Sequence, residues 1–162
     1  GGGSMPVPNQ GPRGTQPPPR QTHHAQGQNL LPQVKYFEND KLRPELLDEE
    51  AMQVGRALAD AGLKSAQLRR FYADVLSLRR RFETDSAVVA PEQRDSIFQN
   101  ILPEFRLLRA KAYYANKRRI LPDVMKLYLQ QHVDAVKTWK DFLAFCRHIE
   151  AVVAYHYFFA RE

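Results

Sequence analysis

The stretch SAQLRRFYADVLSLRRRF, residues 65–82, decides the fold class of this chain. Its apolar residues recur every three or four positions, which places them on one face of an α-helix. They are Leu68, Phe71, Tyr72, Val75, Leu78 and Phe82. Ser65 stands directly in front of this stripe and is predicted to be the N-cap of the helix. The stretch therefore predicts an amphipathic helix.

The chain after residue 44 keeps this helical periodicity, and no segment alternates apolar and polar residues as a half-buried strand would. Four further helices are predicted: 44–61, about 91–119, one that begins near Pro122, and one that begins near Thr138. Gly62 should end the first of them as a C-cap, and Pro103 should kink or divide the second. The prediction is an all-α fold, a compact bundle of about five helices around one core.

The N-terminal part of the chain has a different composition. Residues 1–4, GGGS, are interpreted as a tag remnant in front of Met5. Residues 5–42 are rich in Pro and Gln and are predicted to form a disordered tail, because so few apolar residues cannot offset the entropy lost on ordering. Within the tail, only LLPQVKYF, residues 30–37, is apolar enough to dock on the domain or on a partner. The helical domain is predicted over residues 43–162.

The charge of the chain favours a polyanionic partner. Lys and Arg number 24 against 18 Asp and Glu, which gives a formal net charge of +6. Such a balance favours nucleic acid over an acidic protein surface, although charge alone does not separate nucleic acid from an anionic membrane. The single cysteine, Cys146, excludes an intrachain disulfide, and no apolar run is long enough to span a membrane. A soluble cytoplasmic protein is expected.

The cations are concentrated in the middle of the chain. Between Lys64 and Arg119 there are thirteen Lys and Arg against six Asp and Glu. This segment therefore carries a formal charge of +7, which exceeds the +6 of the whole chain. The predicted helices in this segment are the best candidates for contact with a phosphate backbone.

The stretch LRAKAYYANKRR, residues 108–119, combines these cations with two tyrosines. Lys111, Tyr114 and Arg118 lie three and four positions apart, so they share one face of a helix. Lys and Arg can neutralise phosphates while a tyrosine stacks on a base, and no motif that reads base edges is present. This pattern favours binding to the RNA backbone without sequence specificity. The competing interpretation is that the two cations only solvate an exposed face while Tyr114 packs in the core.

Three blocks, LKSAQLRRFY at residues 63–72, LRAKAYYANKR at 108–118 and IEAVVAYH at 149–156, resemble the small subunit of type III-A CRISPR effector complexes, the Csm small-subunit family. The resemblance extends over about residues 43–160, and the Pro- and Gln-rich tail lies outside it. Tyr113 departs from the pattern, because the resemblance implies a small or aliphatic residue there. The third block is interpreted as determining the fold rather than a site.

The resemblance implies a non-catalytic subunit that contacts the guide RNA and the single-stranded target RNA. It also implies neighbours: further copies of the same chain in tandem, the large subunit, and the backbone subunits of the Csm complex. The predicted RNA-binding residues are Lys64, Gln67, Arg69, Arg70, Arg106, Lys111, Tyr114, Arg118 and Arg119. No catalytic residue, metal or cofactor is predicted, and no membrane partner.

Two other function classes compete with RNA binding. His132, His148 and His156 could supply acid-base groups for RNA cleavage, but they have no paired carboxylates at helical spacing, and Cys146 lacks an evident arrangement with His and Asn. Histidines in the core or on the surface are the preferred interpretation. The second alternative is a helical protein-docking adaptor whose basic surface is not an RNA site.

Overall fold

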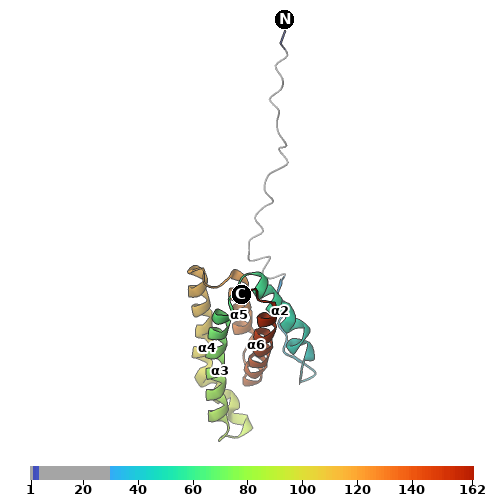
Figure 1. The fold of residues 1–162 in the computed structure, drawn as a ribbon. Coiled ribbons are helices and arrows are strands. Elements are labelled where there is room, and N and C mark those ends of the chain that lie inside the picture. The colour runs from blue at the N-terminus through green and yellow to red at the C-terminus, as the bar shows by residue number, and fades with distance from the viewer. Residues whose placement is uncertain (1, 4–29) are drawn as a thin grey trace.

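The computed structural model describes residues 2–3 and 30–162, and the latter form a bundle of five α-helices (Figure 1). The helices are α2 (Glu49–Asp60), α3 (Ser65–Ser86), α4 (Arg94–Lys117), α5 (Asp123–Ala135) and α6 (Trp139–Phe159). Short 3-10 helices, η1 (Pro44–Leu47) and η2 (Pro91–Gln93), precede α2 and α4. A two-stranded hairpin, β1 (Phe37–Glu38) and β2 (Lys41–Leu42), stands in front of η1. The predicted all-α bundle of five helices is confirmed.

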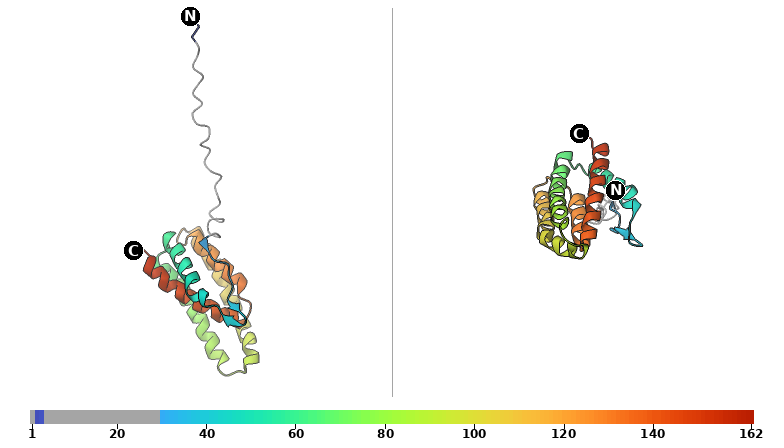
Figure 2. Two further views of the ribbon diagram at one scale, coloured as in Figure 1. Left: turned by 90° about the vertical axis from the view of Figure 1, so that its right-hand side faces the viewer. Right: turned by 90° about the horizontal axis from the view of Figure 1, so that it is seen from below.

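Helix α6 lies between α2 and α3, and α4 joins α3 to α5 on the other side of the bundle (Figures 1 and 2). The core is built around Phe142 of α6, whose ring lies 5.5 Å from Phe98 and 5.6 Å from Phe105 of α4. Phe82 of α3 completes the cluster at 6.1 Å. Every apolar residue of the α3 stripe except Tyr72 is buried, which is the burial that stabilises an amphipathic helix in a bundle.

Most of the predicted helix ends agree with the structure. Gly62 has a φ of +86°, and the amide of Leu63 donates to the carbonyl of Leu58, so a Schellman motif closes α2. Helix α5 starts directly after Pro122. Helix α6 starts after Thr138, whose side chain forms a capping box with Asp141.

One local prediction was wrong, and of the kink or division predicted at Pro103 the division is contradicted. Ser65 is the first residue of α3 rather than its N-cap: Lys64 holds the cap position, and the Ser65 amide donates to the carboxylate of Glu162 at the C-terminal end of the described chain. This bond lowers the pKa of Glu162, because the amide favours the charged carboxylate. Pro103 does not divide α4, which runs without interruption from Arg94 to Lys117. The long stripe of buried residues on α4 keeps the helix in place despite the missing proline amide.

The disordered tail predicted for residues 5–42 differs from the structure over residues 30–42. We call these residues the N-terminal strap. Leu31 and Tyr36 of the strap are buried in the core, and the turn Asn39-Asp40, with φ of +52° and +63°, joins β1 to β2 as a two-residue hairpin loop. This confirms that LLPQVKYF, residues 30–37, docks on the domain, while the disorder predicted for residues 30–42 is wrong. Residues 5–29 of the predicted tail lie outside the described residues, and the tag remnant at residues 1–4 stays a prediction.

Helices α2 and α6 lie close together at Gly55. A Cβ atom at this position would lie 2.8 Å from the backbone nitrogen of His156 and 2.8 Å from the Cβ of Tyr155. Both atoms belong to the main chain or are fixed to it, so a side-chain rotation cannot relieve the overlap. His156 itself is buried, and its Nε2 donates to the carbonyl of Leu63 over 2.7 Å. The α2–α6 contact therefore requires glycine at residue 55.

We expect Gly55→Ala to destabilise the domain, although the same change in an exposed helix interior gains about 1 kcal/mol. The added methyl group must push α2 away from α6, and overpacking of this kind costs about 1–3 kcal/mol. The measurement is the free energy of unfolding in urea, with Gly55→Val as the larger step in the same direction. A Gly55→Ala variant more stable than the original chain would contradict the close approach of the two helices.

The strap covers two buried histidines. The Tyr36 hydroxyl and the Nδ1 of His132 are hydrogen-bonded at 2.7 Å, and the rings of His132 and His148 lie 5.1 Å apart. His148 donates from Nδ1 to the carbonyl of Leu46 over 2.6 Å. Burial holds the pKa of His132 well below its ordinary value, with a smaller contribution from neighbouring His148, and burial also lowers the pKa of His148. Both rings are therefore neutral in the folded domain at neutral pH.

We expect the domain to lose stability as the pH falls below about 6.5, the pKa of an unperturbed histidine. In that range the unfolded chain binds protons at His132 and His148 that the folded chain excludes, so the free energy of unfolding decreases by up to about 1.4 kcal/mol per pH unit for each ring. The thermal midpoint measured between about pH 7.5 and pH 5.5 tests this, since carboxylates titrate mainly below that window. A constant midpoint would show that the rings are not buried in the neutral form.

Candidate nucleic-acid interface

A groove of about 580 Å³ runs between α3 and α4. We call it the α3–α4 groove. Helix α3 lines it with Gln67, Arg70, Phe71 and Asp74, and the α4 side and the turn after it provide Leu107, Ala110, Lys111, Tyr114, Ala115, Arg118 and Ile120. Because the two helices run in opposite directions, residues early in α3 face residues late in α4 (Figure 1). Two stretches far apart in the sequence thus form one surface.

The polar side chains of the α4 wall make two separate contacts. The Arg118 guanidinium lies 5.5 Å from the centre of the Tyr114 ring and donates from Nη1 to the Tyr114 hydroxyl over 3.4 Å. One turn earlier, the Lys111 ammonium forms an ion pair with Asp74 on the opposite wall, with 3.3 Å between Nζ and Oδ2. The periodicity argument that placed Lys111, Tyr114 and Arg118 on one helix face is confirmed.

Tyr114 is 65% exposed. Its ring therefore does not pack in the core, which excludes the competing interpretation of this residue. One face of the ring contacts Arg118, and a cation in this position both holds a tyrosine and adds positive charge to the surface around it. The ring is available for contact with another planar group.

The α3–α4 groove is positively charged. Three cations, Arg70, Lys111 and Arg118, line it against the single carboxylate of Asp74, which leaves a formal charge of +2. The Lys111–Asp74 pair is exposed, so its attraction in water is weak and an incoming phosphate can replace the carboxylate. Cations beside an exposed aromatic ring are the arrangement that holds a single-stranded nucleic acid: phosphates on the cations and a base on the ring.

Five of the nine predicted RNA-binding residues lie together in this groove, and four lie elsewhere. The five are Gln67, Arg70, Lys111, Tyr114 and Arg118. Arg69 points to the other side of α3, where its guanidinium lies 5.8 Å from the centre of the Tyr157 ring. Lys64 holds the N-cap position of α3, and Arg119 lies beyond the C-cap of α4 with a φ of +62°.

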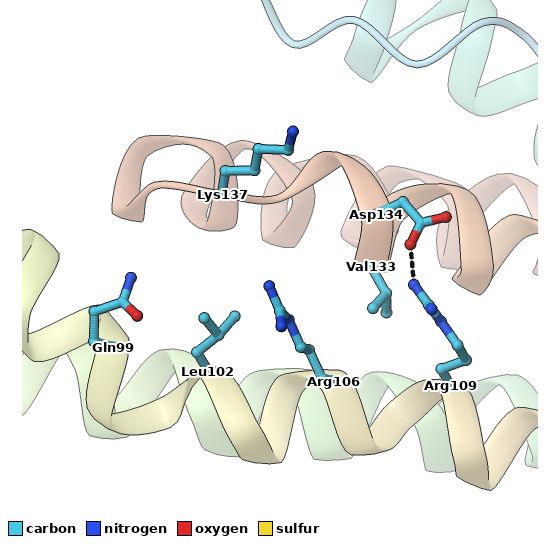
Figure 3. Close-up of a pocket in the computed structure, with 7 residues that line it drawn as sticks. All are labelled: Gln99, Leu102, Arg106, Arg109, Val133, Asp134 and Lys137. Carbon is cyan, nitrogen blue, oxygen red and sulfur yellow. Dashed lines mark hydrogen bonds and ion pairs between the residues drawn. The ribbon is translucent and has the colours of Figure 1, made fainter.

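Arg106 belongs to a second groove, between α4 and α5, with a volume of about 470 Å³ (Figure 3). This groove is lined by Gln99, Leu102, Arg106, Arg109, Val133, Asp134 and Lys137. Arg109 forms an ion pair with Asp134 across it, while the Arg106 side chain extends into the space between the two helices. The positive charge of α4 is therefore divided between two faces, and Arg106 does not join the predicted set in the α3–α4 groove.

The two consecutive tyrosines of α4 have separate environments. Tyr113 points toward α5, where its hydroxyl donates to Gln130 over 2.5 Å and the Lys126 ammonium lies 5.1 Å from the centre of its ring. Tyr114 points into the α3–α4 groove. Tyr113 thus connects α4 to α5, which is a structural role.

Asp74 lines the α3–α4 groove and pairs with Lys111, and the sequence analysis did not predict it. Its only signal in the sequence was its spacing of four from Arg70 and seven from Gln67.

The groups considered for RNA cleavage are buried. His132, His148 and His156 are nearly inaccessible, and the last two donate to backbone carbonyls. Burial also raises the pKa of the Cys146 thiol to about 12, which makes its thiolate rare at neutral pH.

Among the described residues, no helix is long and apolar enough to cross a membrane.

The fold and the groove together define a class: a small all-α domain that carries a basic groove between two antiparallel helices. The family model described as Csm2 Type III-A matches residues 41–162. The chain belongs to this family and is a small subunit of the type III-A Csm complex of a CRISPR system. Comparison with curated proteins and with solved structures found no match.

Proposed function

We propose that this small subunit binds the guide RNA and the single-stranded target RNA along the α3–α4 groove, without reading their sequence. The observation that carries the proposal is the exposed Tyr114 ring with Arg118 on it and Lys111 one turn away, facing Arg70 across the groove. Phosphates are the same at every nucleotide, so these groups bind RNA of any sequence. Specificity then comes from base pairing between guide and target.

Membership in the family supports a place among other subunits of the Csm complex. We propose that the neighbours are the large subunit, the backbone subunits that hold the guide RNA, and further copies of this chain in tandem. In such an array, each α3–α4 groove continues the positively charged path of the next copy. We also propose that this subunit acts in the cytoplasm, together with the other subunits of the complex.

The proposed role is non-catalytic. The buried histidines contribute to the core: His148 donates to the carbonyl of Leu46 in η1, His156 donates to the carbonyl of Leu63 after α2, and His132 contacts Tyr36 of the strap. Groups held in this way cannot reach a scissile phosphate. The α3–α4 groove offers cations, a tyrosine, a glutamine and one ion-paired carboxylate, which are groups that hold a strand.

The experiment that tests this function measures binding of fluorescently labelled single-stranded RNAs of unrelated sequences at several salt concentrations, and analyses the same RNAs for cleavage afterwards. We expect affinities that are alike between sequences, that fall steeply with salt, and intact RNA. Cleavage that disappears when His132, His148 or His156 is replaced would overturn the non-catalytic role. Absence of salt-dependent binding would overturn the RNA role.

A protein-docking adaptor is the second candidate function. Leu107 and Ile120 are exposed large apolar residues that line the same groove, and such residues are common where a partner protein covers a surface. The two candidates differ in salt dependence, because apolar contacts are largely insensitive to salt whereas phosphate contacts are lost. Binding of RNA that is unaffected by charge reversal in the groove would favour the adaptor.

A further inference from the structure

A second exposed tyrosine with an arginine on its ring lies close to the α3–α4 groove. Tyr157, near the end of α6, is 67% exposed, and the Arg69 guanidinium lies 5.8 Å from the centre of its ring. The Tyr114–Arg118 pair has the same arrangement at 5.5 Å. Neither ring has a place in the core, so both are held at the surface with one face beside a cation.

The two pairs lie at the same end of the bundle, on opposite sides of α3. The end of α6 is held there, because the Glu162 carboxylate accepts from the amide of Ser65 at the start of α3 (Figures 1 and 2). Consecutive helix residues point about 100° apart. Arg70 therefore lines the α3–α4 groove while Arg69, the residue before it, faces Tyr157.

The surface of α3 between the two pairs carries short side chains. Helical geometry places Ala66 and Ala73 between the directions of Arg69 and Arg70, and both alanines are exposed. No long side chain of α3 stands between the two tyrosines at this point of the described helix, and Lys64 adds a further exposed cation at its start. A strand that leaves the groove beside Arg70 can cross α3 over the alanines and meet cations on both sides.

We propose that Tyr157 and Arg69 form a second stacking position for the same RNA strand, which leaves the α3–α4 groove, crosses α3 over Ala66 and Ala73, and places an unpaired base on the Tyr157 ring. The proposal rests on the RNA-binding function proposed above. Its ligand is RNA with unpaired bases, because a base offers its flat face to a side chain only when it is not stacked within a duplex. The interface therefore binds single-stranded RNA in preference to double-stranded RNA.

The test uses the full chain and a single-stranded RNA that carries 2-aminopurine, whose fluorescence is quenched by stacking. We expect Tyr157→Leu to weaken binding by about fivefold to a hundredfold and to reduce the quenching, since one base-aromatic stack is lost. Tyr157→Phe keeps the ring and should bind like the original chain. Arg69→Ala should also weaken binding, and Arg81→Ala, an exposed arginine near the other end of α3, is its matched control.

The double variant Lys111→Glu with Arg118→Glu separates this proposal from the function on which it rests. If that double variant loses RNA binding while Tyr157→Leu binds like the original chain, the groove is the RNA site and the second stacking position is wrong. If neither variant changes binding, both proposals fail. If Tyr157→Leu leaves RNA binding intact but weakens self-association in sedimentation measurements, the surface binds protein and the stacking proposal is overturned. Equal loss in Tyr157→Phe and Tyr157→Leu would also overturn it.

Discussion

Reversing the charge of Lys111 and Arg118 together, by Lys111→Glu and Arg118→Glu, is expected to weaken binding of single-stranded RNA by about tenfold or more for every sequence tested. Each substitution removes one phosphate contact and places an anion in the α3–α4 groove. The plot of log affinity against log salt should become flatter by about 0.7 for each lost contact. Fluorescence anisotropy at several salt concentrations measures both effects. Helix α4 should persist, because both positions are exposed and glutamate is a good helix former.

The matched control for this double variant is Arg81→Glu with Arg147→Glu, which changes the net charge by the same amount. Both arginines are exposed on α3 and α6, and neither lines the α3–α4 groove. Long-range repulsion would weaken RNA binding equally in the two double variants. If RNA binds at a local phosphate site, only the first double variant should lose affinity. Asp74→Asn should instead strengthen RNA binding, because it frees Lys111 from its ion pair and makes the charge of the α3–α4 groove more positive. An equal loss of RNA affinity in both double variants would show that binding depends on the net charge of the protein rather than on a local phosphate site.

Deleting residues 1–42 is expected to lower the thermal midpoint by about 10 °C or more, whereas deleting residues 1–29 should leave it nearly unchanged. The longer deletion removes Leu31 and Tyr36 from the core, and full burial of such side chains contributes about 1.5–3 kcal/mol each. It also uncovers His132, which loses its hydrogen bond to Tyr36. Differential scanning calorimetry of both truncated chains measures the two thermal midpoints.

The single substitution Tyr36→Ala tests the same strap without a truncation. It should cost about 3–5 kcal/mol of unfolding free energy, as large-to-small core changes of aromatic residues do. Tyr36→Phe is the conservative partner, since it keeps the packing and removes only the bond to His132. If the chain without residues 1–42 has the same thermal midpoint as the original chain, the strap contributes no stability to the helices.

The five helices could be predicted because each one shows a stripe of apolar residues at helical spacing. Gly62 and Thr138 also have the local chemistry that ends and starts helices. For the strap, the apolar side chains of residues 30–37 indicated a segment that could dock, but its order and its hairpin could not be predicted in this way. LLPQVKYF is short, and the surrounding Pro- and Gln-rich composition dominates any average over residues 5–42. Its two-residue strands are stabilised by tertiary contacts of Leu31 and Tyr36, which lie outside any local pattern.

Half of the candidate site followed from the sequence because Lys111, Tyr114 and Arg118 belong to a single helix face. Gln67 and Arg70 of the opposite wall were also predicted, but that they face these residues depends on how α3 is rotated against α4, and this rotation follows from core packing rather than from charge. Arg106 and Arg119 were chosen for their charge, and they lie on other surfaces. Ser65 was expected to cap α3, but the carboxylate that binds its amide comes from Glu162, 97 residues away.

The bond between Ser65 and Glu162 has a practical consequence for anyone who attaches a purification tag, a fluorophore or a cross-linker to this subunit. A group joined after Glu162 would lie at the start of α3, beside Lys64, and close to the Arg69 and Tyr157 pair. It would obstruct the proposed second stacking position and lower the measured affinity for RNA. Leu30 is bound to Gln53 of α2, and neither residue lines the α3–α4 groove, so a group attached at residue 30 leaves this groove accessible.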